Sequence, residues 1–382
     1  MSGARSWRGD VWRGDIQILR MLAVMAVVLF HLDVPGCDRS YLGVDVFFVI
    51  SGFLIGGRLE AFAAGRGGAD GMRGDGGISL KGLQRFWRAR IVRLWPAAAV
   101  TMAGAALGAA LLLDGREWAL FLWQMAGSAA LAANGALWAQ AADFPASRGI
   151  MPLLHYWSLA VEEQFYMVSP ALFAIPTARH RRNAMAALTV GSLALHAWMT
   201  PRYGAIAFFG LPTRAWELGV GVLLAQWDDR AVGAAEAWLT RLRPLGWVML
   251  TALLATGWHA LPAEMVLLIA IALTAWLVGT RAPDEPAPRI LTAIGDRSYA
   301  IYLTHWPVIA LIGHAASERS ALWMRGAEVV AMALASEALW QWVDRRDRSR
   351  RRVAVWLGVQ IALLLGALAV LWGLPHHGLD AL

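Results

Sequence analysis

Long apolar runs recur along the whole chain, and no other feature limits its fold so strongly. A helix of about 17–25 mostly apolar residues is long enough to cross a bilayer, and helices satisfy their own main-chain polar groups there. The runs predict an all-α, polytopic membrane bundle formed by a single domain over residues 1–382. The eleven expected spans are 16–33, 42–60, 91–113, 153–176, 184–200, 203–227, 245–260, 263–280, 294–314, 321–343 and 353–373.

The composition agrees with a membrane protein and excludes other classes. Hydrophobic residues make up 58% of the chain and charged residues only 16%, and the mean hydropathy is +0.49. These values lie outside the range of soluble globular proteins. Many of the 21 Trp lie near the ends of the runs, as an interfacial aromatic belt predicts. The single cysteine, Cys37, excludes an internal disulfide.

Positive charge is distributed unevenly between the two expected faces of the membrane. With the N-terminus in the cytoplasm, 26 of the 34 Lys and Arg fall on the cytoplasmic side, as the positive-inside rule requires. This distribution explains the net charge of +7 without nucleic acid as a partner. The apolar stretch 118–138 is interpreted as a helix at the interface or within the bundle, because a further span there would reverse the bias. Arg20 interrupts the first run, which argues against a cleavable signal peptide.

The first two runs carry three residues that are costly inside a membrane. A charged side chain there costs about 2.5–3.5 kcal/mol, so it needs a partner or a function. Arg20 and His31 share one helix face, about 16 Å apart along the axis. Asp45 begins the second run, and a tight antiparallel pair of helices brings it near His31. A carboxylate that orients one imidazole nitrogen leaves the other basic, so the trio predicts a catalytic base. A snorkelling Arg and a capping His are the structural alternative.

Two further arginines run into the third apolar segment. Arg90 and Arg93 are neighbours on a helix at the cytoplasmic mouth, and paired guanidinium groups suit a phosphate or pyrophosphate ligand. The alternative is a basic flank that meets anionic lipid headgroups.

Other polar residues lie within the later spans. Arg214 and Glu217 have the spacing of a self-neutralising ion pair on one helix. Ser298, Tyr302 and His305 lie on one face of the helix before Pro307. The structural alternative is that His305 is a core histidine with a hydrogen bond to a neighbouring hydroxyl. No zinc-like spacing predicts a metal site. The second-tier candidates, which we assign to an acceptor vestibule, are Glu162, Ser298, Tyr302 and His305.

Taken in order, these motifs resemble the acyltransferase-3 family of integral membrane acyltransferases, and the resemblance covers nearly the full length. It rests on Asp15, Arg20 and His31, on GVDVFFVISGFLI at 43–55, on RIVRLWPA at 90–97, on WSLAVEEQFY at 157–166 and on SYAIYLTHWP at 298–307. The resemblance implies a bundle of about ten or eleven spans. It also places the family's functional Arg and His on Arg20 and His31, and its Arg-x-x-Arg pair on Arg90 and Arg93.

The resemblance further implies an O-acyltransferase that moves an acyl group, most often acetyl, from acyl-CoA to a hydroxyl of a carbohydrate or glycolipid. Acetyl-CoA is then a co-substrate, with no permanently bound cofactor, and the expected location is the bacterial inner membrane. Because the chain ends soon after its last span, we expect a lone transferase or one with a separate extracytoplasmic partner protein.

A transporter or flippase for an anionic lipid-linked sugar is the alternative function. Intramembrane Arg, His and Glu suit that class equally well. Against it, the sequence shows neither a two-fold internal repeat nor a matched pair of broken helices.

Overall fold

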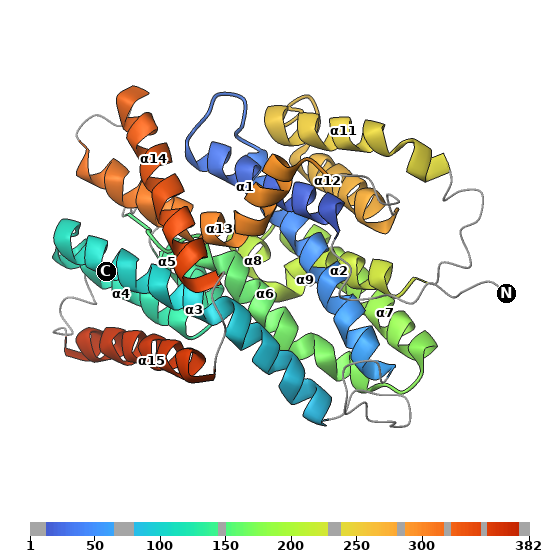
Figure 1. Ribbon diagram of the computed structural model, residues 1–382, viewed down its shortest axis with the longest axis horizontal. Helices are drawn as coiled ribbons and strands as arrows, with labels where there is room; N and C mark the ends of the chain where they lie inside the picture. The colour runs from blue at the N-terminus through green and yellow to red at the C-terminus, as the bar shows by residue number, and fades with distance from the viewer. Residues whose placement is uncertain are drawn as a thin grey trace. The chain divides into compact units, whose positions relative to one another are not determined.

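The computed structural model of the protein describes residues 13–64, 80–143, 150–227, 238–280, 287–316, 322–344 and 350–373, and its regular elements in these ranges are helical (Figure 1). The helices are α1 (Gly14–His31), α2 (Gly43–Ala63), α3 (Leu80–Leu112), α4 (Gly115–Ala129), α5 (Ala133–Asp143), α6 (Tyr156–Val168), α7 (Ala178–Met199), α8 (Gly204–Phe209), α9 (Leu211–Ala225), α11 (Arg243–Thr256), α12 (Ala263–Gly279), α13 (Arg289–Ala315), α14 (Leu322–Leu339) and α15 (Arg350–Gly373). The 3₁₀ turns η1 (Ser40–Leu42) and η2 (Ser169–Ala174) precede α2 and follow α6, and the π-helical turn η4 (Trp340–Asp344) follows α14.

The all-α fold predicted from the apolar runs is confirmed, and each predicted span falls on one helix or on two consecutive ones. Among the described residues, three segments are long and apolar enough to cross a membrane by themselves: Gly14–His31, Ser40–Ala63 and Leu80–Leu112. Shorter apolar helices include α12 and the segment Leu357–Trp372 of α15. The protein is therefore an integral membrane protein, and the number of crossings stays a prediction.

The stretch 118–138 differs from the single helix expected there. It contains most of α4 and the start of α5, separated by a tight turn. Leu131 takes a left-handed backbone conformation with φ of 59°, which ends the first helix. At 15 and 11 residues, neither helix reaches the length of an untilted span.

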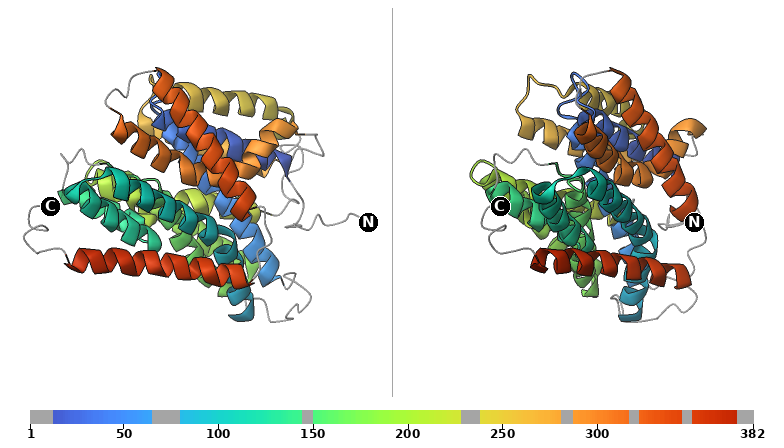
Figure 2. Two further views of the ribbon diagram at one scale, coloured as in Figure 1. Left: turned by 60° about the vertical axis from the view of Figure 1, so that its left-hand side comes forward. Right: turned by 90° about the vertical axis from the view of Figure 1, so that its left-hand side faces the viewer.

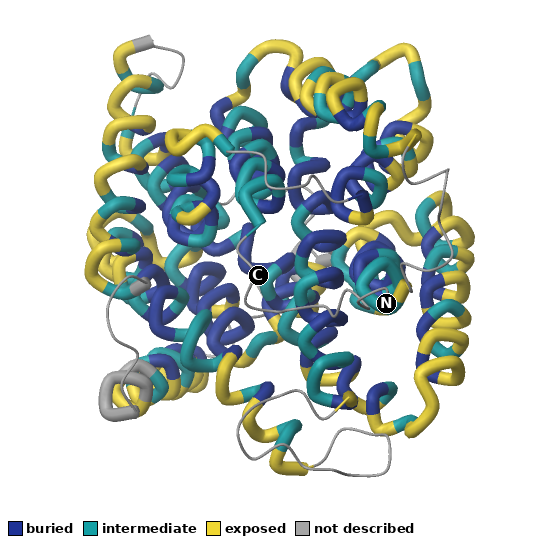
Figure 3. The backbone as a smooth tube through the Cα atoms, turned by 45° about the vertical axis from the view of Figure 1, so that its right-hand side comes forward, coloured by how far each residue is buried: buried dark blue, intermediate teal, exposed yellow. Residues whose placement is uncertain are grey.

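The chain divides into two compact units, and each is described on its own. Unit 1 comprises Met1–Phe86, Phe165–Ala197 and Pro212–Ser298, and unit 2 comprises Trp87–Gln164, Trp198–Leu211 and Tyr299–Leu382. In unit 2, α15 lies alongside α4 (Figure 2). Most helices turn one side inward, so buried and exposed residues alternate along the chain (Figure 3).

The core of unit 1 is formed by apolar faces of α1, α2, α9, α11 and α12. Within it, α2 and α9 approach so closely that glycine is required at the contact. A Cβ on Gly52 would strike the main chain of Leu218, and a Cβ on Gly221 would strike the carbonyl oxygen of Val49. Farther along, a Cβ on Gly56 would lie 2.9 Å from the Cα of Val222. The contacts advance in the same direction on both helices, so α2 and α9 run parallel.

Glycines also fix the helix that carries Arg20 and His31. A Cβ on Gly43 at the start of α2 would strike the carbonyl oxygen of Ala23 in α1. A Cβ on Gly295 in α13 would strike the carbonyl oxygen of Gln17, one turn before Arg20. Small residues therefore let both neighbouring helices touch the α1 backbone directly.

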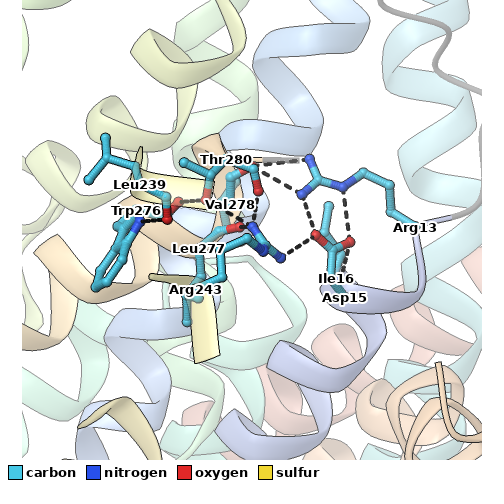
Figure 4. A network of polar contacts seen from close by, with 9 residues as sticks. All are labelled: Arg13, Asp15, Ile16, Leu239, Arg243, Trp276, Leu277, Val278 and Thr280. Carbon is cyan, nitrogen blue, oxygen red and sulfur yellow. Dashed lines mark hydrogen bonds and ion pairs between the residues drawn. The ribbon is translucent and has the colours of Figure 1, made fainter. Parts of the chain in front are cut away.

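A polar network holds the start of α1 against the end of α12 (Figure 4). Asp15 accepts hydrogen bonds from Arg13 at 2.6 Å and from Arg243 at 3.1 Å. Both arginines also donate to carbonyl groups at the C-terminal end of α12, Arg13 to Val278 and Arg243 to Leu277 and Thr280. The last carbonyls of a helix have no partner within the helix and carry partial negative charge. The two cations satisfy these groups.

The close contact between α2 and α9 leads to a prediction about glycine substitutions. Gly221→Ala should lower the thermal unfolding temperature in detergent, because the new methyl group overpacks a main-chain contact at a cost of about 1–3 kcal/mol. Gly191→Ala in α7 is the matched control, since a Cβ there meets nothing within 4 Å. It should be neutral or stabilising by up to about 1 kcal/mol. Equal unfolding temperatures for the two variants would contradict the proposed contact.

Candidate active site

Helix α1 is continuous from Gly14 to His31, so Arg20 and His31 lie on one helix in unit 1. Arg20 is half-buried, and its Nη1 donates to Oε1 of Gln17 at 3.3 Å. His31 ends the helix and is also half-buried. Its ring donates a hydrogen bond to the carbonyl of Val27, one turn earlier. This bond sets the tautomer and leaves the other ring nitrogen as the proton acceptor.

Asp45 has a partner that sequence reasoning did not assign. Its Oδ1 accepts a hydrogen bond of 2.5 Å from Nη2 of Arg214 on α9. The Arg214–Glu217 ion pair predicted from spacing is confirmed, with 3.3 Å between Nη1 and Oε1. The side chains of all three residues are at most 6% exposed, so this is a buried cluster of one cation and two carboxylates. The expected role of Asp45 beside His31 stays a hypothesis.

The parallel arrangement of α2 and α9 helps to explain why one arginine can serve two carboxylates. The N-terminal end of a helix carries about half a positive charge. Asp45 lies in the first turn of α2, where that charge stabilises a carboxylate. Glu217 lies in the second turn of α9, where the effect is weaker. The Arg214 guanidinium is thus the main source of positive charge for this pair.

The arginines of α3 differ in burial. Arg85 and Arg88 are exposed, Arg93 is half-buried and Arg90 is buried at 6% exposure. The charge of Arg90 also acts on Glu163 of α6, so an acidic residue lies within electrostatic reach of this arginine. Arg90 and Arg93 lie in unit 2, as does that stretch of α6.

A buried hydroxyl and imidazole cluster joins α6 to α13 in unit 2. Ser158 Oγ and the Tyr302 hydroxyl lie 2.5 Å apart, and the Tyr302 hydroxyl also donates to the carbonyl of His155. His305 is fully buried, and its Nδ1 lies 2.7 Å from the carbonyl of Tyr302. Glu162 is half-buried, and its charge acts on Tyr302.

His155 is a buried residue whose role was not predicted from the sequence, although Pro307 gives a signal for it. Proline has no amide N–H, so Pro307 leaves the carbonyl of Leu303, four residues earlier, without its helical partner. His155 Nε2 supplies the missing hydrogen bond at 3.0 Å. A proline inside a buried helix therefore indicates that a donor must arrive from elsewhere, but not which residue provides it.

The structure gathers the predicted site residues into two groups, one in each unit. Unit 1 contains Arg20, His31, Asp45 and the fully buried Ser298, and unit 2 contains the arginine pair of α3 and the remaining candidates. Within the residues that the structure describes, no group of three His, Cys, Asp or Glu is arranged to hold a metal ion.

The buried charge cluster predicts unequal effects of removing its members. Arg214→Met leaves two buried carboxylates without their cation, and breaking a buried pair in this way costs about 3–5 kcal/mol. Asp45→Asn should cost less, because Arg214 keeps Glu217. Thermal unfolding in detergent measures both, with Arg182→Met at an exposed position of α7 as the control. Equal losses from Arg214→Met and Asp45→Asn would contradict this explanation.

Comparison with known proteins identifies the family. The model of the acyltransferase domain family matches residues 13–374. Peptidoglycan O-acetyltransferase OatA of Listeria monocytogenes is 28% identical over 327 residues, which cover 78% of this chain and 49% of that protein. O-acetyltransferase OatA of Staphylococcus aureus is 26% identical over 359 residues, covering 87% of this chain and 56% of that protein.

The chain thus spans about half the length of these relatives. No solved structure matches it. Because the family match extends over nearly the whole chain, the resemblance seen in the motifs is confirmed: the protein belongs to the acyltransferase-3 family of membrane acyltransferases.

Proposed function

We propose that this acyltransferase moves an acetyl group from cytoplasmic acetyl-CoA to a hydroxyl of a cell-envelope carbohydrate. The names of both OatA relatives support O-acetyl transfer, and peptidoglycan in one of those names supports a polysaccharide acceptor. The observation that carries the donor assignment is the graded burial of α3. Arg85 and Arg88 near the start of the helix are exposed, whereas Arg90 is buried and Arg93 is half-buried.

In the proposed reaction, Arg90 and Arg93 bind phosphate groups of the donor through charge-assisted hydrogen bonds. His31 acts as the general base on the acceptor hydroxyl, with its tautomer set by the carbonyl of Val27. The hydroxyl oxygen bonds to the acyl carbon, the carbon–sulfur bond breaks, and the thiolate recovers the proton. Arg20, about 16 Å from His31 along the axis of α1, lines the channel through which the donor reaches the base.

The remaining candidates are assigned to the acceptor. Glu162 supplies a half-buried carboxylate to the acceptor vestibule, while Ser298, Tyr302 and His305 shape it from α13. Because acyl-CoA is cytoplasmic and most positive charge lies on one expected face, we place the protein in the bacterial inner membrane with its N-terminus in the cytoplasm.

Binding of acetyl-CoA to the detergent-purified protein tests the donor site. Arg90→Ala and Arg93→Ala should each weaken binding by roughly 10–100-fold, since a hydrogen bond to a charged group contributes about 1.5–3 kcal/mol. Arg88→Ala is the matched control, because Arg88 lies on the same helix but is exposed. Isothermal titration calorimetry gives the three dissociation constants. If Arg88→Ala weakens binding as much as Arg93→Ala does, the arginines act only as a basic surface.

The same preparation separates the base from the donor site. His31→Ala should keep acetyl-CoA binding within about twofold and lower thiol release by about 10²–10⁴-fold. Thiol release is followed with a thiol-reactive dye. A wild-type protein that binds acetyl-CoA and releases no thiol with any hydroxyl acceptor would contradict the transferase and favour transport.

A further inference from the structure

The connection between α1 and α2 is attached to the end of α11 and the turn after it by three polar residues, Cys37, Arg39 and Ser40. Cys37 Sγ contacts the carbonyl of Ala255 at 3.5 Å, and Ser40 Oγ donates to the carbonyl of Leu254. Arg39 lies between them, and its Nη1 donates to three carbonyls in the turn that follows α11. Those acceptors are Gly257 at 3.3 Å, Trp258 at 3.4 Å and Leu261 at 2.8 Å.

Helix chemistry explains why these contacts form. Helix α11 ends at Thr256 and is capped by Gly257, whose left-handed backbone has φ of 66°, and the next residue also has a positive φ. Such an end exposes carbonyl groups that lack partners within the helix and carry partial negative charge. A cation with several N–H groups suits this position. Arg39 is an exception to the positive-inside distribution, since it lies in an expected outer segment, and this local role explains it.

Aromatic contacts lead from this attachment to His31. Tyr41 follows Ser40 directly, and its ring packs edge-on against Phe30 with 5.6 Å between centroids. Phe30 in turn packs edge-on against the imidazole of His31 at 5.0 Å. Edge-to-face aromatic pairs have preferred geometries, so each ring restricts the orientation of the next. Every residue of this path lies in unit 1.

We propose that Arg39 and Tyr41 are positioning residues that hold the His31 imidazole in its reactive orientation. Arg39 fixes the connection on the end of α11, and Tyr41 transmits that position to His31 through Phe30. The proposal rests on the proposed function, in which His31 is the base. Moving a catalytic group by about 1 Å can lower the rate by about 10²-fold. Loss of either residue should therefore lower turnover without affecting donor binding.

Rates of thiol release and acetyl-CoA dissociation constants for matched variants test this proposal. Tyr41→Leu and Arg39→Ala should each lower kcat by about tenfold or more. Donor binding should stay within about twofold. Tyr41→Phe retains the ring contact and should keep nearly the wild-type kcat. Arg39→Lys retains the charge and part of the hydrogen bonding, and should recover part of the rate. The acceptor probe is a soluble N-acetylglucosamine oligosaccharide, with water as the reference acceptor.

A double-mutant comparison distinguishes positioning from a general loss of structure. If Tyr41 acts through His31, adding Tyr41→Leu to His31→Ala should cause no further loss of the residual rate. Thermal unfolding temperatures of all variants identify any that fail to fold. A full additional loss in the double variant, or a wild-type rate for both Tyr41→Leu and Arg39→Ala, would overturn the proposal while the proposed function stands. Absence of thiol release by the wild type would overturn both.

Discussion

The structure depends on one constraint: polar groups enclosed by apolar helices must find partners within the protein. Arg181 meets this constraint by donating to Glu60 at 2.9 Å and to the carbonyls of Ile175 and Pro176. The carbonyl groups at the ends of α11 and α12 accept hydrogen bonds from side chains of distant segments. The carbonyl that Pro307 leaves without a helical partner does the same. In each case the hydrogen-bond partner comes from a different element. The bond that satisfies the polar group therefore also determines how the two elements pack.

The periodicity of the sequence was sufficient to predict the features that depend on residues close together along the chain. The helical character of the apolar runs and the Arg214–Glu217 pair both follow from the 3.6-residue repeat, and the structure contains both. The partner of Asp45 could not be predicted this way, because Arg214 is 169 residues away and pairing across helices depends on packing. The family motifs identified Asp45 as important without indicating what binds it.

Helix breaks were harder to predict than helices. The turn at Leu131 relies on a left-handed conformation in a residue other than glycine, which composition does not reveal. The run 153–176 changes from α6 to the 3₁₀ turn η2 at Ser169, just before Pro170, although its hydropathy is continuous. His155 is a similar case, because its role follows from a carbonyl that becomes available only once α13 and the segment before α6 are together.

The glycine contacts between α2 and α9 have a mechanical consequence. Two helices whose backbones touch have no flexible side chains between them, so they cannot slide or rotate by small steps. The buried pair of Asp45 and Arg214 lies seven residues before Gly52 and Gly221, and it locks the same two helices along their length. Helices α2 and α9 therefore move together as one rigid unit. Any rearrangement of unit 1 during turnover takes place at contacts other than the one between α2 and α9.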